Sequence, residues 1–236
     1  MKRILAVCLV IASLVVLAKA AEFWNSKPYE EWSRAETMRL LTDSPWAKTV
    51  SLRNGTLSAS PRMIGGPQGV EDSRAETTIW YTVSIRSSVP VRQANARLAA
   101  INQKYDKMDA AAKKEFDDKW SKYLQNKFDV IVVAVNYESN DPSVQRQLAT
   151  AFQVQTLETM KPTTSLTFAD GNKLEPVGFA GGPREIQIAF PHPATLAQNT
   201  SFIVEFMHPG VTNQAAQRIT TKFSLKDMTF NGAPSL

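Results

Sequence analysis

The chain has 236 residues, of which 43% are hydrophobic and 21% charged, so it is long enough to bury the core of one globular domain. Its 27 basic and 22 acidic side chains give a formal net charge of +5. A nucleic-acid-binding surface needs a clustered excess of positive charge, and this balance argues against one.

Residues 1–20 have the three-part form of a secretory signal peptide. Two basic residues precede an apolar run from Ile4 to Ala18, and Ala18-Lys19-Ala20 matches the small-x-small pattern of a cleavage site. A membrane-spanning helix needs about 20 apolar residues, and this run is shorter. We therefore expect export with cleavage after Ala20 and no membrane span in the mature chain. An uncleaved N-terminal anchor is the alternative.

Cleavage of this segment would change both the charge and the thiol content of the chain. The segment holds three basic residues and no acidic residue, so its removal would lower the net charge from +5 to +2. The only cysteine, Cys8, lies inside the apolar run and not directly after a cleavage site, which argues against a lipid anchor. The mature chain would then have no disulfide, no thiol nucleophile and no thiolate metal site.

Residues 21–48 are predicted to form a helical segment that docks on the main domain, residues 49–236. Ser33 and Glu36 have the spacing of a capping box, in which each side chain bonds the backbone N–H of the other residue at a helix start. Tryptophans are concentrated in this segment, namely Trp24, Trp32 and Trp46. We expect them to dock the segment on its own domain. An interface with a partner is the alternative, because large aromatic side chains are also favoured there.

Three stretches resemble those of a group of uncharacterised exported bacterial proteins. The first two are Lys27 to Ser33 (KPYEEWS) and Leu41 to Lys48 (LTDSPWAK), and the third is Ser87 to Ala94 (SSVPVRQA). Together these stretches hold 23 of the 236 residues, about a tenth of the chain. The resemblance implies a bacterial exported protein, and it implies no activity and no site residues.

Two segments of the main domain depart from a strand pattern. Residues 53–76 contain four glycines, two prolines and few large apolar residues, which predicts a mobile surface loop. Residues 90–127 are predicted to be a helical insertion, because apolar residues recur every three or four positions from Ala94 to Tyr123. We expect two helices, the second capped by Asp109. One long helix would have the same apolar stripe.

The remaining segments have strand patterns. Residues 79–85 alternate between apolar and other side chains, and residues 130–135 form an apolar run typical of a strand covered on both faces. Asp170-Gly171 predicts a tight hairpin turn. Further strands are predicted at residues 49–52, 165–169, 172–178, 185–190, 201–207 and 218–230, the last with a bulge at Lys226-Asp227.

We therefore predict a mainly β fold with helical additions, in the α+β class. Its architecture is expected to be an antiparallel β-sandwich with an inserted helical hairpin and an N-terminal helix. The alternative is an α+β sheet with both helices packed across one face. That arrangement follows if the helical stripe is buried against residues 130–135.

No catalytic, metal or cofactor motif stands out in the sequence. The two histidines, His192 and His208, are next to prolines in predicted turns and lack the spacing of three convergent zinc ligands. The chain has no G-x-S-x-G elbow, and its glycine-rich stretches lack the lysine and Ser/Thr that end a phosphate-binding loop. We therefore predict no catalytic residue, no metal ligand and no cofactor.

One constellation, Arg86, Ser88 and Arg92, predicts an anion-binding site. The strand that ends at Arg86 is followed by a predicted helix start, with Pro90 in the first turn. Arg92 then lies near a helix N-terminus, where the helix dipole disfavours a cation. A bound anion would resolve this conflict. A neighbouring carboxylate is the alternative.

The functional expectation rests largely on elimination. We expect an exported, periplasmic or extracellular, non-enzymatic binding or structural module of the cell envelope, whose partner is an unknown protein or envelope component. One alternative is a hydrolase that acts on an envelope or extracellular substrate through dispersed residues. The other is a carrier of a small apolar ligand held between sheet and helices.

Overall fold

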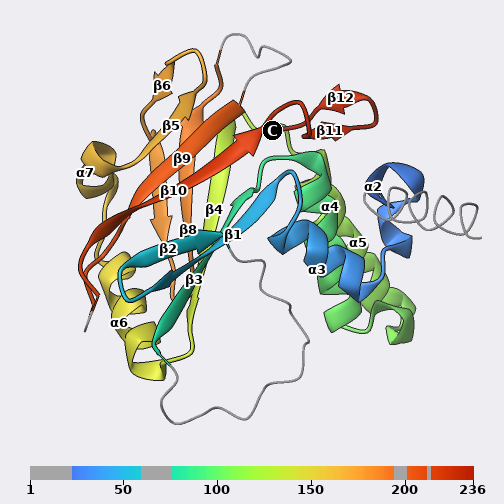
Figure 1. Cartoon of the computed structure of the whole chain (residues 1–236). Helices are drawn as coiled ribbons and strands as arrows, with labels where there is room; N and C mark the ends of the chain where they lie inside the picture. Colours follow the sequence, from blue (N-terminus) through green and yellow to red (C-terminus); the bar gives the residue numbers. More distant parts are fainter. Residues whose placement is uncertain (1–22, 60–75, 194–200, 212–213) are drawn as a thin grey trace, which may run out of the picture.

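The structure is a computed structural model that describes residues 23–59, 76–193, 201–211 and 214–236. The predicted signal peptide and residues 60–75 of the predicted loop lie outside the described residues. Two antiparallel sheets pack against each other, and helices flank the larger sheet (Figure 1). The predicted α+β class is thus confirmed, with two layers of sheet as in a sandwich.

The larger sheet has six strands in the order β2-β1-β3-β4-β8-β7, and all neighbours are antiparallel. The alternation in residues 79–85 places Ile79, Tyr81 and Val83 on a fully buried inner face, with Trp80 and Thr82 on the outer face. The strands are β1 (Ala47–Arg53), β2 (Thr56–Ala59), β3 (Thr78–Ile85), β4 (Val130–Ser139), β7 (Gly178–Gly181) and β8 (Glu185–Pro191).

The smaller sheet has four strands in the order β10-β9-β5-β6. Phe202, Val204 and Phe206 are buried along one face of β9, and the ring of Phe206 meets that of Tyr81 edge to face at 5.4 Å between centroids. The main core therefore lies between the inner faces of the two sheets. The strands are β5 (Ser165–Phe168), β6 (Lys173–Leu174), β9 (Ser201–His208) and β10 (Gln217–Ser224).

Helices α3 (Arg34–Thr42) and α4 (Val89–Asn102) lie over the outer face of the larger sheet, and α5 (Ala110–Gln125) packs on α4 (Figure 1). The predicted pair of helices is confirmed, because the 3-10 turn η2 (Tyr105–Lys107) separates α4 from α5 and Asp109 caps α5. In the described part of the chain, no helix is long and apolar enough to cross a membrane. The shorter elements are α2 (Phe23–Ser26), η1 (Tyr29–Glu31), α7 (Leu157–Met160), η3 (Lys161–Thr163), β11 (Thr229–Phe230) and β12 (Ala233–Pro234).

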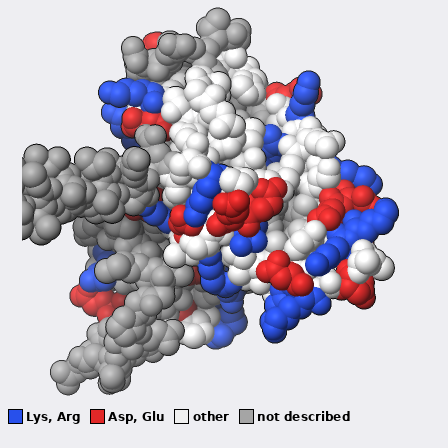
Figure 2. All heavy atoms as spheres, turned by 90° about the vertical axis from the view of Figure 1, so that its right-hand side faces the viewer, with Lys and Arg blue, Asp and Glu red and all other residues white. Residues whose placement is uncertain are grey.

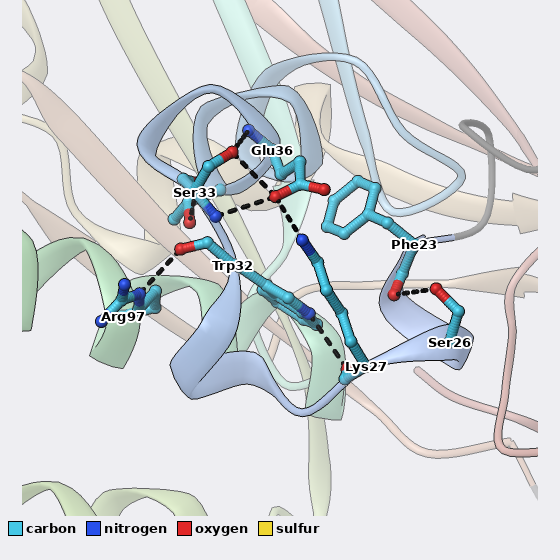
Figure 3. A network of polar contacts seen from close by, with 8 residues as sticks. Phe23, Ser26, Lys27, Trp32, Ser33, Glu36 and Arg97 are labelled. Carbon is cyan, nitrogen blue, oxygen red and sulfur yellow. Dashed lines mark hydrogen bonds and ion pairs between the residues drawn. The ribbon is translucent and has the colours of Figure 1, made fainter.

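The N-terminal segment is bound to the rest of the domain by aromatic and polar contacts. Trp32 and Trp46 are fully buried and Trp24 is 7% exposed, so all three indole rings belong to the core. Figure 3 shows that Arg97 Nε on α4 donates to the Trp32 carbonyl at 2.7 Å, which links the segment to the rest of the domain. Within the segment, Glu36 Oε2 accepts hydrogen bonds from Lys27 Nζ at 2.8 Å and from the Ser33 N–H at 2.8 Å. The predicted capping box at the start of α3 is therefore present.

Three local predictions need correction. Residues 56–59 are a strand and not part of a loop, because Asn54 and Gly55 both adopt positive φ and close a β1–β2 hairpin. Residues 226–227 lie in a turn between β10 and β11 and not in a bulge, since the N–H of Asp227 donates to the Ser224 carbonyl. The predicted strand 172–178 is not continuous: it contains the short β6 and the first residue of β7, which pairs with β8 in the other sheet.

Helix α6 (Pro142–Gln153) was not predicted. Its sequence signals are local, because Asp141 accepts hydrogen bonds at the helix start, Pro142 occupies the first turn, and Val144, Leu148 and Phe152 recur every four residues. These three side chains are buried, and the Phe152 ring packs on Tyr137 at 4.8 Å. Tyr137 shares the inner face of β4, so α6 extends the core between the sheets.

Candidate functional site

A cavity of about 240 Å³ lies between the outer face of the larger sheet and helices α3 and α4. Its floor is a row of side chains across four strands, because Thr49 pairs with Thr82, Thr82 with Asn136, and Asn136 with Glu185. Side chains directly opposite each other in antiparallel strands project from the same face. The next row adds Trp80 and Glu138, which also pair across β3 and β4.

The two walls of the cavity differ in chemistry. Helices α3 and α4 contribute mainly apolar side chains, Met38, Leu41 and Leu98, together with the amide of Asn95. The sheet contributes hydroxyl, amide, carboxylate and guanidinium groups and one indole ring. A sheet face that helices cover is usually apolar, since close packing excludes water from it. The floor under α3 and α4 is therefore more polar than a closely packed sheet–helix interface.

The two ends of the polar row are held by different contacts. At β1, Thr49 Oγ1 lies 3.0 Å from Thr82 Oγ1 and donates to the Thr42 carbonyl at 3.0 Å. At β8, Arg86 Nη1 donates to Glu185 Oε1 at 2.5 Å, and Gln187 Nε2 donates to the same oxygen at 2.8 Å. These contacts fix the orientation of the groups that line the cavity.

The ion pair at the β8 end is partly shielded from water. The side chains of Arg86 and Glu185 are 28% and 26% exposed. Burial by itself lowers the pKa of Arg86, but attraction to Glu185 and the hydrogen bond to it outweigh burial, so the pKa is raised. Asn136 and Glu138, in contrast, are exposed, and the cavity opens to solvent beside them.

The three residues of the predicted anion site do not share one cavity. Only Arg86 lines the cavity on the sheet. Ser88 is fully buried and its Oγ donates to the Ile85 carbonyl at 2.8 Å. Arg92 is 7% exposed and its Nη1 donates to the carbonyls of Leu124 and Asn126, at 2.8 and 2.7 Å, and to that of Tyr123 at 3.2 Å.

The conflict between Arg92 and the dipole of α4 is therefore resolved by another helix. The carbonyls that accept from Arg92 belong to the C-terminal end of α5, which carries partial negative charge. Neither an anion nor a carboxylate is needed to compensate this cation. The anion site itself stays a prediction, and titration of phosphate into the wild type and Arg92→Ala tests it.

The two histidines have different environments. His192 is exposed just after β8, whereas His208, at the end of β9, is fully buried with Nδ1 2.5 Å from the Tyr81 hydroxyl. Burial lowers the pKa of His208 to about 4, so its ring is neutral at physiological pH. Among the described residues, no three His, Cys, Asp or Glu side chains come together in a group that could hold a metal ion.

Sequence reasoning found Arg86 and missed most of the cavity. The alternation of residues 79–85 predicts that Trp80 and Thr82 share one face of their strand. Their partners on β1 and β4, and Glu185 on β8 next to Asn136, lie far away in the sequence. The signal that could have found Asn136 and Glu138 is the switch from the apolar run of β4 to alternating polar residues at its end.

Comparisons with known proteins give no indication of what the site binds. No protein-family model matches the chain, and neither a curated protein nor a solved structure matches it.

Proposed function

We propose that this protein is an exported binding module of the cell envelope that holds a small hydroxyl-rich ligand, of the class of a saccharide unit, in the cavity on the larger sheet. The observation that carries the proposal is the polar row from Thr49 to Glu185 beneath two helices. Export and the envelope location are proposed from residues 1–20 of the sequence alone.

The chemistry of the cavity suits a ligand with hydroxyl groups on an apolar ring. Hydroxyl, amide and carboxylate groups of the sheet supply both donors and acceptors, and the Trp80 indole supplies a flat apolar surface. The volume of about 240 Å³ is below the roughly 300–1,000 Å³ of pockets for drug-sized ligands. One sugar ring is therefore the size of ligand that we propose.

The same cavity bears on the alternative functions. A carrier of an apolar ligand between sheet and helices would need an apolar lining, and the floor of this cavity is polar. A hydrolase would use the two carboxylates that line it, Glu138 and Glu185. Binding without turnover separates the proposed module from that hydrolase.

The test is calorimetric titration of the exported protein with monosaccharides and with soluble oligosaccharides released from the envelope. Asn136→Ala is the informative variant, because Asn136 is exposed on the cavity floor and its loss should not disturb the core. We expect binding to be weaker by about fivefold or more, since a hydrogen bond to a ligand is worth about 1 kcal/mol or more. Glu185→Gln should weaken binding further.

Glu205→Gln is the matched control for Glu185→Gln. Glu205 also pairs with an arginine, Arg218, at 3.6 Å, but it lies on the smaller sheet away from the cavity. The Glu205→Gln variant should bind saccharide with the affinity of the wild type. Equal affinity of Asn136→Ala and wild type, or no saccharide binding at millimolar concentration, contradicts the proposal. Release of shortened sugars in the mixture indicates the hydrolase instead.

A further inference from the structure

Helix α4 separates the cavity on the sheet from a second hollow on its opposite side. Asn95 and Leu98 face the first cavity, whereas Ala96 and Ala100 line a cleft between α4 and α5. Successive residues of a helix are about 100° apart, which puts these two pairs on opposite faces. The cleft has a volume of about 520 Å³, within the usual range for pockets that bind small molecules.

The cleft exists because α5 is incompletely packed. Phe116, Trp120 and Leu124 recur every four residues and form one apolar stripe, yet every residue of α5 is described and none is buried. The facing residues of α4, Ala96 and Ala100, are too small to fill the space beside these rings. An amphipathic helix usually buries such a stripe, so the half-exposed rings leave room for a ligand.

Aromatic rings and carboxylates line this cleft together. Its rings come from Tyr29, Tyr105, Phe116 and Trp120. Its carboxylates come from three different elements, with Glu30 on η1, Asp106 on η2 and Asp117 on α5. The hydroxyl of Tyr105 donates to Asp117 Oδ2 at 2.9 Å, which ties one ring to one carboxylate.

The charge in the cleft is locally negative. Of the residues that line it, Arg97 is the one cation, and its Nε is engaged with the Trp32 carbonyl at 2.7 Å. Lys113, which is not part of the lining, has its Nζ 5.5 Å from the centroid of the Tyr105 ring. Burial, followed by the nearby Glu30, raises the pKa of Tyr29 to about 12, in keeping with a negative field there. Basic and acidic side chains are interspersed over the face that carries α2 and α5 (Figure 2), so the carboxylates of the cleft are a local feature.

We propose that the cleft between α4 and α5 binds a small aliphatic polyamine. Ammonium groups are attracted to the faces of aromatic rings and to carboxylates, and both kinds of group line this cleft. The methylene chain between them fits against Ala96, Ala100 and Leu124. Because the three carboxylates lie on separate elements, a ligand with two or more ammonium groups matches them better than a single cation does. This site is independent of the cavity on the sheet.

The test is titration of the full exported protein with cadaverine and spermidine, followed by calorimetry and tryptophan fluorescence. Pentane-1,5-diol, which has the chain length of cadaverine without its charge, is the ligand control. We expect the amines to bind with an affinity that falls as salt is added, because exposed charges are screened, and the diol to give no response. Equal binding of diol and diamine overturns the proposal.

Two neighbouring carboxylates of α5 provide a matched pair of variants. Asp117 lines the cleft, whereas Asp118 is exposed outside it and pairs with Lys114 at 2.9 Å. Asp117→Asn keeps an oxygen that can accept from Tyr105 and should lower amine affinity about tenfold, the effect of losing one charge-assisted contact. Asp118→Asn should bind as the wild type does. An equal loss of amine affinity in both variants would indicate nonspecific attraction to negative charge and would contradict the proposed site.

Trp120→Leu provides a second check that does not change charge. It keeps an apolar side chain on α5 but removes one ring of the cleft, and it should weaken amine binding while the helical circular dichroism stays unchanged. Unchanged amine affinity in this variant would contradict the role of the rings. Binding of a lysine-rich peptide with no response to either free amine would overturn the proposal and indicate a protein partner instead.

Discussion

The hydroxyl of Tyr81 lies 2.5 Å from Nδ1 of His208, and this contact joins the inner faces of the two sheets. Burial raises the pKa of Tyr81, so the phenol stays protonated and shares one hydrogen bond with the neutral imidazole. Nε2 of His208 is buried and has no hydrogen-bond partner among the described residues. A protonated His208 would therefore be a buried cation without a compensating acceptor.

The protein should lose stability as the pH falls from about 6.5 to about 4. The pKa of His208 is lowered by burial from 6.5 to about 4, so in this range the unfolded chain takes up a proton that the folded chain does not. This group alone should cost about 3 kcal/mol of unfolding free energy at the lower pH. Urea unfolding at a series of pH values measures the loss.

Substitution of each histidine separates this effect from general acid unfolding. His208→Gln should be less stable at neutral pH but should have a flatter dependence between pH 4 and 6.5. His192→Gln, which changes the exposed histidine, should follow the wild-type curve. If the unfolding free energy of His208→Gln falls with pH as steeply as that of the wild type, another group causes the loss of stability.

Arg92→Ala should lower the free energy of unfolding by about 2–4 kcal/mol, since hydrogen bonds from a charged donor are worth about 1.5–3 kcal/mol each and are not additive. The variant leaves three carbonyls near the end of α5 without their donor. Amide hydrogen exchange should also increase in α5 before the strands are affected. Arg146→Ala, at an exposed position of α6, should change stability by less than about 0.5 kcal/mol. Equal stability of the two variants would contradict the role of Arg92.

Gly181→Ala should destabilise the contact between β7 and α6. A methyl group at this position would lie 2.6 Å from the carbonyl oxygen of Phe152, so the backbone of one element must shift. Such overpacking typically costs about 1–3 kcal/mol. Gly178→Ala on the same strand is the comparison, because its methyl would meet only the Cβ of Ala189, at 3.2 Å, and should cost less. Thermal unfolding of both variants measures the difference.

Ser33→Ala should weaken the start of α3 by about 1 kcal/mol, the usual effect of removing a helix cap. The Ser33 side chain accepts from the Glu36 N–H at 3.3 Å and donates to Glu36 Oε2 at 2.7 Å. Glu31→Ala, at an exposed position of η1 two residues before the cap, leaves the cap intact and serves as the control. Denaturant unfolding that gives the same midpoint for Ser33→Ala and Glu31→Ala would argue against the cap.

Local sequence signals were sufficient where a structure depends on neighbouring residues. The capping box of Ser33 and Glu36, the cap at Asp109 and the alternation of β3 depend on spacings of two or three residues, and all three are present. Comparable local signals surround Asp141 at the start of α6 and Asn54-Gly55 in the β1–β2 turn, so these two features also depend on neighbouring residues.

Other features could not be derived from local patterns. The sequence indicated which side chains of β3 share a face, but it did not indicate that β8 would lie next to β4 and bring Glu185 to Arg86. It placed Arg92 near a helix start, but the carbonyls that bind it come from the end of a different helix. Such contacts depend on which elements pair and in which register.

By itself the sequence determined a leader-like N-terminus. It also determined the many strands, the pair of helices and which residues share a face, because the periods of strands and helices are local properties of the backbone. Only the tertiary structure decided where those faces meet. The cavity on the sheet and the cleft between α4 and α5 arise from elements distant in the chain, and their volume is set by how completely the helices pack. Packing is a collective property of all the elements, so it cannot be read from any one segment.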